Sequence, residues 1–146
     1  MQISSRFTLA VHIMLCIDYF HKDNKVTSEF LASSTNVNPV IIRNILGQLR
    51  KGGLIKTSRG TGGSQTTRPL NEITLLDLYK SVECVDKGEL FSFHENPNQF
   101  CPVGKNIHNV LDSRLEQVQK VMEEELSSIK LSDIELDLAS IINEKR

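Results

Sequence analysis

Residues 38–68, NPVIIRNILGQLRKGGLIKTSRGTGGSQTTR, decide the fold of this 146-residue chain. Asn38 is a favourable helix cap, and Pro39 suits the first turn of a helix, where an N–H group would have no intrahelical partner. The apolar residues that follow have helical spacing and predict a helix over residues 39–51: Ile42, Ile45, Leu46 and Leu49.

The same stretch then changes from a helical to a strand pattern. The pair Gly52-Gly53 ends the helix, and residues 54–58 have the composition of a strand. A glycine-rich turn at 59–63 leads into a second strand at 64–68, which Pro69 ends. Residues 27–35 predict a short helix upstream, so a helix-turn-helix followed by a hairpin is expected, which is a winged helix.

Helices are also predicted on both sides of this unit. Residues 3–21 form a helix that is apolar almost all round, which is typical of a helix buried on two sides. After the hairpin, Thr74 and Asp77 have the spacing of a capping box and open a helix that extends to about Glu83. Residues 84–102 are irregular.

The C-terminal part predicts a long helix over 103–129 with one apolar stripe: Ile107, Leu111, Leu115, Val118, Met122 and Leu126. Roughly 25 residues is about twice the usual helix length, so a partner subunit is the natural cover for the stripe. Ser132 and Asp133 are expected to cap a last helix that ends near Ile142. The predicted fold is therefore mostly α with a small β-hairpin: a winged helix-turn-helix (1–83), a linker or sensor loop (84–102) and dimerisation helices (103–146).

Charge is divided unevenly along the chain. Residues 1–69 carry 9 Lys and Arg against 3 Asp and Glu, whereas residues 70–146 carry 8 against 15. Between Phe30 and Asn71 there is no acidic residue at all. This asymmetry predicts a polyanionic partner, double-stranded DNA, for the first half only. The basic residues of the acid-free stretch are Arg43, Arg50, Lys51, Lys56, Arg59 and Arg68.

Several function classes are disfavoured by composition and motifs. The sequence has no stretch near the ~20 apolar residues of a membrane span and no secretory signal pattern, so we expect a cytoplasmic protein without a membrane partner. Three widely spaced cysteines do not form a disulfide framework. No catalytic constellation appears, and we expect no enzyme activity.

With these elements placed, the chain resembles the Rrf2 family of winged helix-turn-helix bacterial regulators. The resemblance extends from about Met1 to Ile129. Three segments carry it: SSRFTLAVHIML at 4–15, residues 38–64 with the pattern L-R-K-G-G-L followed by R-G-x-G-G, and ITLLDLYKSVE at 73–83. It implies a homodimer with crossing long helices, a recognition helix at 39–51 in the major groove, and a wing at 59–64 that touches the minor groove.

Candidate DNA-binding residues follow from these placements. Arg43 can bind guanine and Asn44 adenine through two hydrogen bonds each, and Val40 lies beside them. Gly47 on the same face would let the helix backbone approach DNA closely, and Arg59 in the wing suits a narrow minor groove. The remaining candidates are the wing glycines Gly60 and Gly62 and the phosphate-binding residues Lys51, Lys56 and Arg68. We expect a homodimeric repressor on a pseudo-palindromic operator.

The signal is the least determined property. Cluster-binding relatives carry three cysteines in the loop before the long helix, and here only Cys101 matches one of those positions. Because a cluster normally needs four protein ligands, we expect no iron–sulfur cofactor. His94, Cys101 and His108 are evenly spaced, but this spacing is not that of a metal site, so we expect no other metal either. Cys101 is a candidate redox thiol because it precedes a helix N-terminus, although a bystander role is equally open. Cys16 is expected to pack in the core.

Two alternatives remain at this stage. A winged helix can bind protein without binding DNA, although the acid-free stretch is against it. A metal or iron–sulfur sensor is the other alternative, and a small molecule or an oxidant could equally be the signal.

Overall fold

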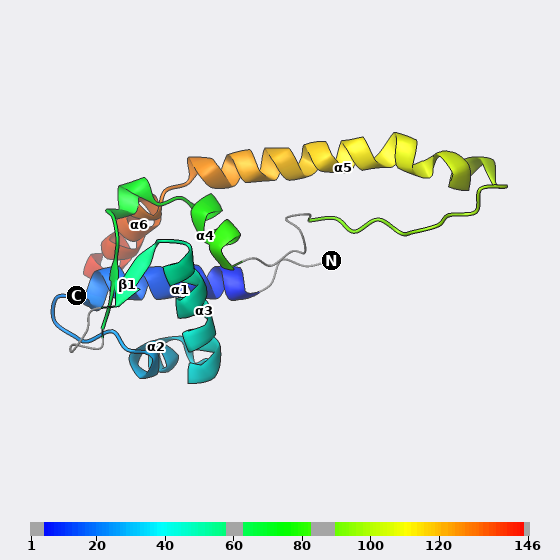
Figure 1. The fold of residues 1–146 in the computed structure, drawn as a ribbon. Helices are drawn as coiled ribbons and strands as arrows, with labels where there is room; N and C mark the ends of the chain where they lie inside the picture. Colours follow the sequence, from blue (N-terminus) through cyan, green and yellow to red (C-terminus); the bar gives the residue numbers. More distant parts are fainter. Residues whose placement is uncertain (1–4, 58–62, 83–89, 145–146) are drawn as a thin grey trace.

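The computed structural model describes residues 5–57, 63–82 and 90–144 (Figure 1). The predicted fold class is confirmed, because the described chain is mostly helical with a two-stranded antiparallel sheet. The elements are, in order, α1 (Ser5–Phe20), α2 (Ser28–Thr35), α3 (Pro39–Lys51), β1 (Ile55–Thr57), β2 (Ser64–Thr66), the 3₁₀ helix η1 (Leu70–Glu72), α4 (Leu75–Val82), α5 (Pro102–Ser128) and α6 (Leu131–Glu144).

The two helices of the helix-turn-helix begin at side-chain caps. Thr27 Oγ1 accepts a hydrogen bond from the Phe30 N–H at 3.2 Å and starts α2. Asn38 Oδ1 accepts from the Val40 N–H at 2.8 Å and starts α3, with Pro39 in its first turn. Asn36, at φ 55°, has the left-handed conformation that Asn tolerates and turns the chain between the helices. The predicted Asn38 cap of α3 is thus confirmed.

The end of α3 is set by its two glycines. Gly53 has φ +76°, which only glycine adopts without strain. Its N–H donates to the Arg50 carbonyl at 2.9 Å, while the Leu54 N–H donates to the Leu49 carbonyl at 3.0 Å. This pair of hydrogen bonds is a Schellman motif, and it directs the chain from α3 into β1.

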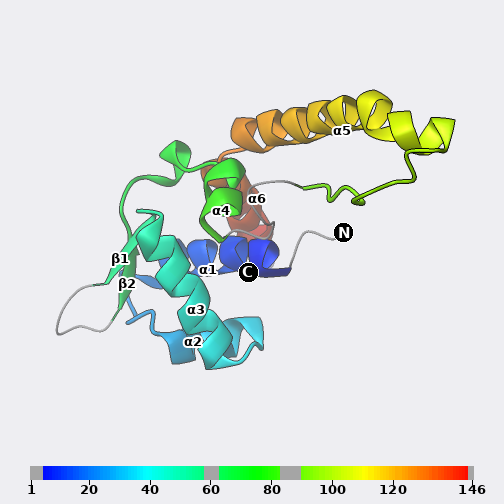
Figure 2. The ribbon, with the colours of Figure 1, turned by 45° about the vertical axis from the view of Figure 1, so that its right-hand side comes forward.

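The core lies between α1 and the helix-turn-helix. In Figures 1 and 2, α1 runs through the middle of the body, where it contacts α2, α3, α4, β2 and α6. Its residues Ile13, Met14 and Ile17 are fully buried. The apolar face predicted for α3 is confirmed, because all four of its residues are buried: Ile42, Ile45, Leu46 and Leu49.

The wing is short and is attached to the body at its base. Ile55 pairs with Thr66 and Thr57 with Ser64. The Ser64 N–H also donates to the Val26 carbonyl at 3.2 Å. Gly63 lies so close to this segment that a Cβ atom there would be 3.3 Å from the Val26 nitrogen. The base of the hairpin is therefore packed against the turn between α1 and α2.

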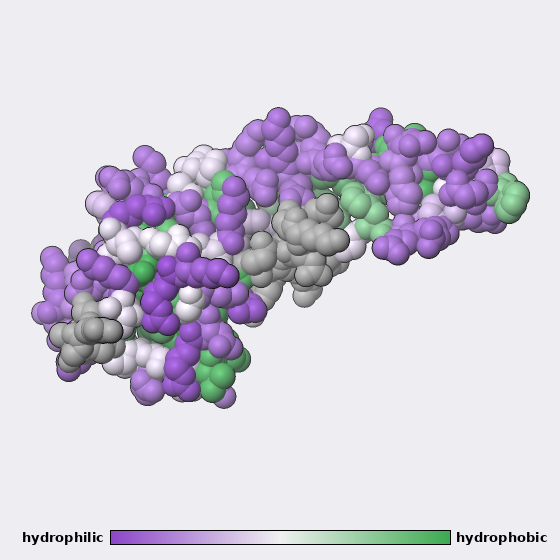
Figure 3. Space-filling model, in the orientation of Figure 1, coloured by the Kyte–Doolittle hydropathy of each residue, from purple (hydrophilic) through white to green (hydrophobic). Residues whose placement is uncertain are grey.

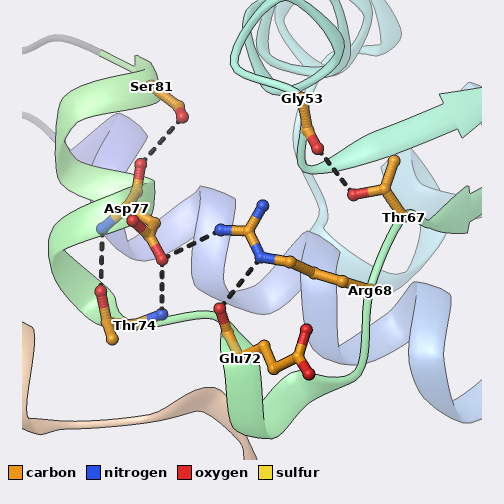
Figure 4. A network of polar contacts seen from close by, with 7 residues as sticks. All are labelled: Gly53, Thr67, Arg68, Glu72, Thr74, Asp77 and Ser81. Atoms are coloured by element: carbon orange, nitrogen blue, oxygen red, sulfur yellow. Dashed lines mark hydrogen bonds and ion pairs between the residues drawn. The ribbon is translucent and has the colours of Figure 1, made fainter.

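Arg68 and Asp77 join the wing to α4 (Figure 4). The capping box predicted for α4 is confirmed, since the Thr74 N–H donates to Asp77 Oδ2 at 2.9 Å and the Asp77 N–H donates to Thr74 Oγ1 at 3.2 Å. The same Asp77 oxygen lies 3.2 Å from Arg68 Nη2, and Arg68 Nε donates to the Glu72 carbonyl at 2.9 Å. Arg68, expected to bind phosphate, thus has its guanidinium engaged within the protein.

Helix α5 projects from the body as a long arm (Figures 1 and 2). Among its residues, all of which the structure describes, no side chain is buried. Val110, Val118 and Val121 are each more than half exposed. Apolar surface is also visible at the outer end of the arm (Figure 3), where Phe100 and Val103 are exposed. The predicted long helix is confirmed, and within one chain Val118 of its apolar stripe is exposed while the other five residues are half-buried.

The junction of α5 and α6 is hydrogen-bonded to the start of α4. The Leu75 N–H donates to the Ile129 carbonyl at 3.0 Å, and the Leu131 N–H donates to the Ile73 carbonyl at 2.9 Å. The predicted start of the last helix was wrong by about two residues. Asp133 lies inside the first turn of α6, where its Oδ2 accepts from the Lys130 N–H at 3.2 Å, so neither it nor Ser132 precedes the helix.

Replacing Asp77 by Ala is expected to lower the free energy of unfolding by about 1–2 kcal/mol, the usual cost of losing a helix cap. The ion pair with Arg68 adds little, because both side chains are about one-third exposed to solvent. Urea unfolding followed by circular dichroism measures the change. Asp23→Ala, an exposed aspartate in the turn after α1, is the matched control. Equal stability of the two variants would contradict the role given to Asp77.

Candidate nucleic-acid interface

The exposed face of α3 carries the residues predicted to read DNA. Val40, Arg43 and Asn44 are all exposed. A Cβ atom built on Gly47 would have no described atom within 4 Å, so the helix backbone there faces open space. Ile41, which the helical pattern did not single out, is 45% exposed and adds apolar surface beside Val40. The first turns of α3 thus present two hydrogen-bonding side chains between apolar ones.

Arg43 lies close to an acidic residue of α2. Its Nη1 is 3.5 Å from Glu29 Oε1, and both side chains are more than half exposed. An exposed ion pair contributes about 1 kcal/mol or less, so Glu29 can release the guanidinium to a stronger acceptor. Glu29 was not identified from the sequence, because it lies 14 positions before Arg43 and just outside the acid-free stretch.

The end of α3 and the first strand add positive charge. Lys51, at the end of α3, and Lys56, in β1, are both exposed. Arg50 Nη1 donates to Thr57 Oγ1 at 2.9 Å and so connects the end of α3 to the wing. The other wing candidates, Arg59, Gly60 and Gly62, lie outside the described residues.

Two further basic residues flank the base of the wing. Lys22 and Lys25, in the turn after α1, line a polar crevice of about 360 Å³ together with residues 63–65 of the hairpin. Both lysines are exposed. They lie outside the acid-free stretch, and no feature of the sequence connects this turn with the hairpin 38 or more positions later.

The N-terminal turn of α1 also contacts α3. Arg6 Nη2 donates to Gln48 Oε1 at 2.8 Å. This hydrogen bond lies one turn after Asn44 along α3 and connects α1 to the surface that would face DNA.

Cys101 lies at the N-terminus of α5, as predicted. It occupies the cap position of the helix. The backbone amide of Gly104 lowers the pKa of its thiol below the ordinary value, and the amide of Val103 adds a smaller effect in the same direction. A lower pKa increases the thiolate fraction at neutral pH, and the thiolate is the reactive form.

The histidines near Cys101 pair with other groups. The rings of His94 and His108 lie 5.2 Å apart, and His108 Nδ1 is 3.1 Å from Asp112 Oδ1. Across residues 5–57, 63–82 and 90–144, no group of three His, Cys, Asp or Glu side chains is arranged to hold a metal ion. No helix in the same ranges is long and apolar enough to cross a membrane.

Comparisons with known proteins agree with this arrangement. A family model described as Rrf2, iron-dependent transcriptional regulator, matches residues 3–135. YwnA of Bacillus subtilis, named as a candidate HTH-type transcriptional regulator, is 41% identical over 90% of this chain and 96% of its own length. A crystal structure of a candidate transcriptional regulator from Lactobacillus plantarum is 30% identical, with a TM-score of 0.75 over 92% of this chain and 90% of that one. A crystal structure of a candidate DNA-binding protein is 35% identical, with a TM-score of 0.71 over 89% and 98% of the two chains.

Proposed function

The chain belongs to the Rrf2 family of transcriptional regulators, and we propose that it is a homodimeric repressor that binds a specific operator in cytoplasmic DNA. The observation that carries the proposal is the surface of α3, which is exposed and holds Arg43 and Asn44 in a segment without acidic residues. A surface that recognised protein would not need this separation of charge. The wing and its basic flank extend the same surface.

In the proposed complex, α3 lies in the major groove. Arg43 leaves Glu29 and forms two hydrogen bonds with a guanine, while Asn44 binds an adjacent adenine. Lys51 and Lys56 bind phosphates, as do Lys22 and Lys25 if the backbone passes the base of the wing. Gly47 leaves room for the close approach that these contacts require.

The proposed dimer is formed through α5. Val110, Val118 and Val121 of α5 are exposed in the single chain, the other residues of its apolar stripe are half-buried, and apolar surface on soluble proteins marks interaction sites. A second copy carries the same stripe, so two chains can cover each other through a two-fold axis. The two α3 helices would then read half-sites about one helical turn of DNA apart, or a multiple of that distance.

Arg43→Ala is expected to weaken operator binding about ten- to hundredfold and to relax the preference at one base pair, because a two-bond contact with guanine is lost. Lys51→Ala should weaken binding to all sequences alike and reduce the salt slope by about one, because a phosphate contact is lost. Fluorescence anisotropy at several salt concentrations, on an operator selected from genomic fragments, measures both effects.

Lys120→Ala, on the charged face of α5, is the control for the loss of one positive charge. Unchanged affinity of the Arg43 variant, or an equal effect of the Lys120 variant, would contradict the assignment of α3 as the reading surface.

Val118→Asp is expected to convert the dimer into a monomer. The substitution should not disturb the fold, because Val118 is 51% exposed in the single chain, yet it places an unpaired charge in the proposed interface. Sedimentation equilibrium should give twice the chain mass of 16.5 kDa for the unaltered protein and the single mass for the variant. Gln117→Asp adds the same charge at the neighbouring exposed position and should remain dimeric. A dimeric Val118 variant would exclude this interface.

A thiol response at Cys101 is also proposed, and its lowered pKa supports it. The thiolate would attack hydrogen peroxide, the O–O bond would break, and sulfenic acid and hydroxide would form. An iron–sulfur cluster is not proposed, because the loop before α5 lacks the further cysteines that a cluster needs.

Peroxide is therefore expected to change the operator affinity of the unaltered protein but not that of Cys101→Ser. The rate at which iodoacetamide alkylates Cys101 should be measured by peptide analysis at several pH values. Its midpoint should lie at a lower pH than for the same cysteine in a synthetic peptide of residues 98–104, where no helix orients the amides. Retained peroxide sensitivity in the Ser variant would refute this mechanism.

A further inference from the structure

A cavity of about 600 Å³, open to solvent and lined in part by the exposed residues His12, Tyr19 and Ser34, lies between α1 and α6, away from the exposed face of α3. Helix α6 lies beside α1 in Figure 1, and Ser34 of α2 closes a third side. The volume falls within the range of small-molecule sites, about 300–1,000 Å³. Most of the wall is apolar and comes from Val11, Leu15, Tyr19, Phe20, Leu138 and Ile142.

Three polar side chains meet on one wall of this cavity. His12 Nε2 lies 3.0 Å from Ser34 Oγ, and Cys16 Sγ lies 3.2 Å from the same oxygen. A hydroxyl has one proton and two lone pairs, so Ser34 can bond to both neighbours and retain capacity for a third group. Cys16 is buried, as expected from the sequence, but it also belongs to this cluster.

The lining restricts the chemistry of an occupant. Within the described part of the chain, no Asp, Glu, Lys or Arg lines the cavity. A nucleotide or a metal ion would find no opposite charge to pair with there, so the lining favours an uncharged molecule. We propose that the cavity binds an uncharged aromatic molecule with one hydroxyl group. Its ring would pack between the apolar side chains, and its hydroxyl would bond to Ser34 Oγ, which keeps a position for a third group.

Position in the fold makes this site suitable for regulation. Ser34 lies in the last turn of α2, two residues before the left-handed Asn36 that leads into α3. Leu138 and Ile142 belong to α6, which directly follows the α5 arm. An occupant therefore contacts both the helix-turn-helix and the C-terminal helices. A ligand that binds one arrangement of these elements better shifts the population towards it. This regulatory role, unlike binding itself, rests on the proposed function.

Equilibrium dialysis with 1-naphthol, an uncharged aromatic alcohol, tests binding without DNA. The unaltered protein is expected to bind one molecule per chain. Ser34→Ala should weaken binding about two- to tenfold, the effect of one hydrogen bond. Ser33→Ala, at the neighbouring exposed serine of α2, which is not part of the lining, should have no effect. Leu15→Trp should abolish binding by filling the cavity, with circular dichroism confirming its fold. Naphthalene, which lacks the hydroxyl, should bind both the unaltered protein and the Ser34 variant equally weakly.

Three results would overturn the proposal: no saturable binding by the unaltered protein, equal binding by Ser33 and Ser34 variants, or undiminished binding by Leu15→Trp. If a second copy of the chain covered the cavity, the unaltered protein would show no saturable binding. Leu15→Trp would then disrupt that contact and sediment as a monomer. A second experiment measures operator affinity with and without 1-naphthol, and we expect the affinity to change. If the protein bound 1-naphthol but no operator, the proposed function and the regulatory role would be contradicted, whereas the binding site would still be supported.

Discussion

The relative position of the wing and α4 depends on the carboxylate of Asp77. It caps α4 through the Thr74 amide and holds Arg68 at the end of the wing. Next to Thr74, the Ile73 carbonyl accepts a hydrogen bond from the Leu131 N–H at the junction of α5 and α6. The wing, α4 and the C-terminal helices therefore meet within a few residues. These hydrogen bonds add directional contacts to the buried apolar ones that Ile73, Leu78 and Leu131 make in the core.

The distribution of charge follows a related constraint. The basic residues of α3 and β1 can remain exposed without internal partners only if a polyanion or solvent compensates them. Two of them have partners within the protein: Arg50 donates to Thr57 Oγ1, and Arg43 forms an exposed ion pair with Glu29 that is weak enough to be exchanged. The acidic C-terminal half keeps polyanions away from α5 and α6, where exposed apolar side chains favour contact with another apolar surface.

Local signals were the most reliable part of the sequence. The spacing of Ile42, Ile45, Leu46 and Leu49, the Asn38 cap and the Thr74–Asp77 capping box each involve residues within one or two turns, and each appears in the structure as expected. The start of α6 was misplaced because Asp133 can cap from either side of a helix start: as the cap itself, or as the third residue accepting the cap's N–H. Sequence spacing does not distinguish these two geometries.

Contacts between distant residues could not be derived in this way. Arg68 is basic and lies in an acid-free segment, so phosphate binding was the reasonable expectation, yet Asp77 and the Glu72 carbonyl occupy its guanidinium. The pairing of Glu29 with Arg43, the lysines beside the wing and the cluster of Ser34 with His12 and Cys16 likewise join residues from different elements.

Periodicity, caps and glycines act locally, so the helices, the hairpin and the separation of charge follow from the order of the residues alone. Which charges are satisfied internally and where a cavity remains depend on how separate helices pack, and these features emerge in the folded chain.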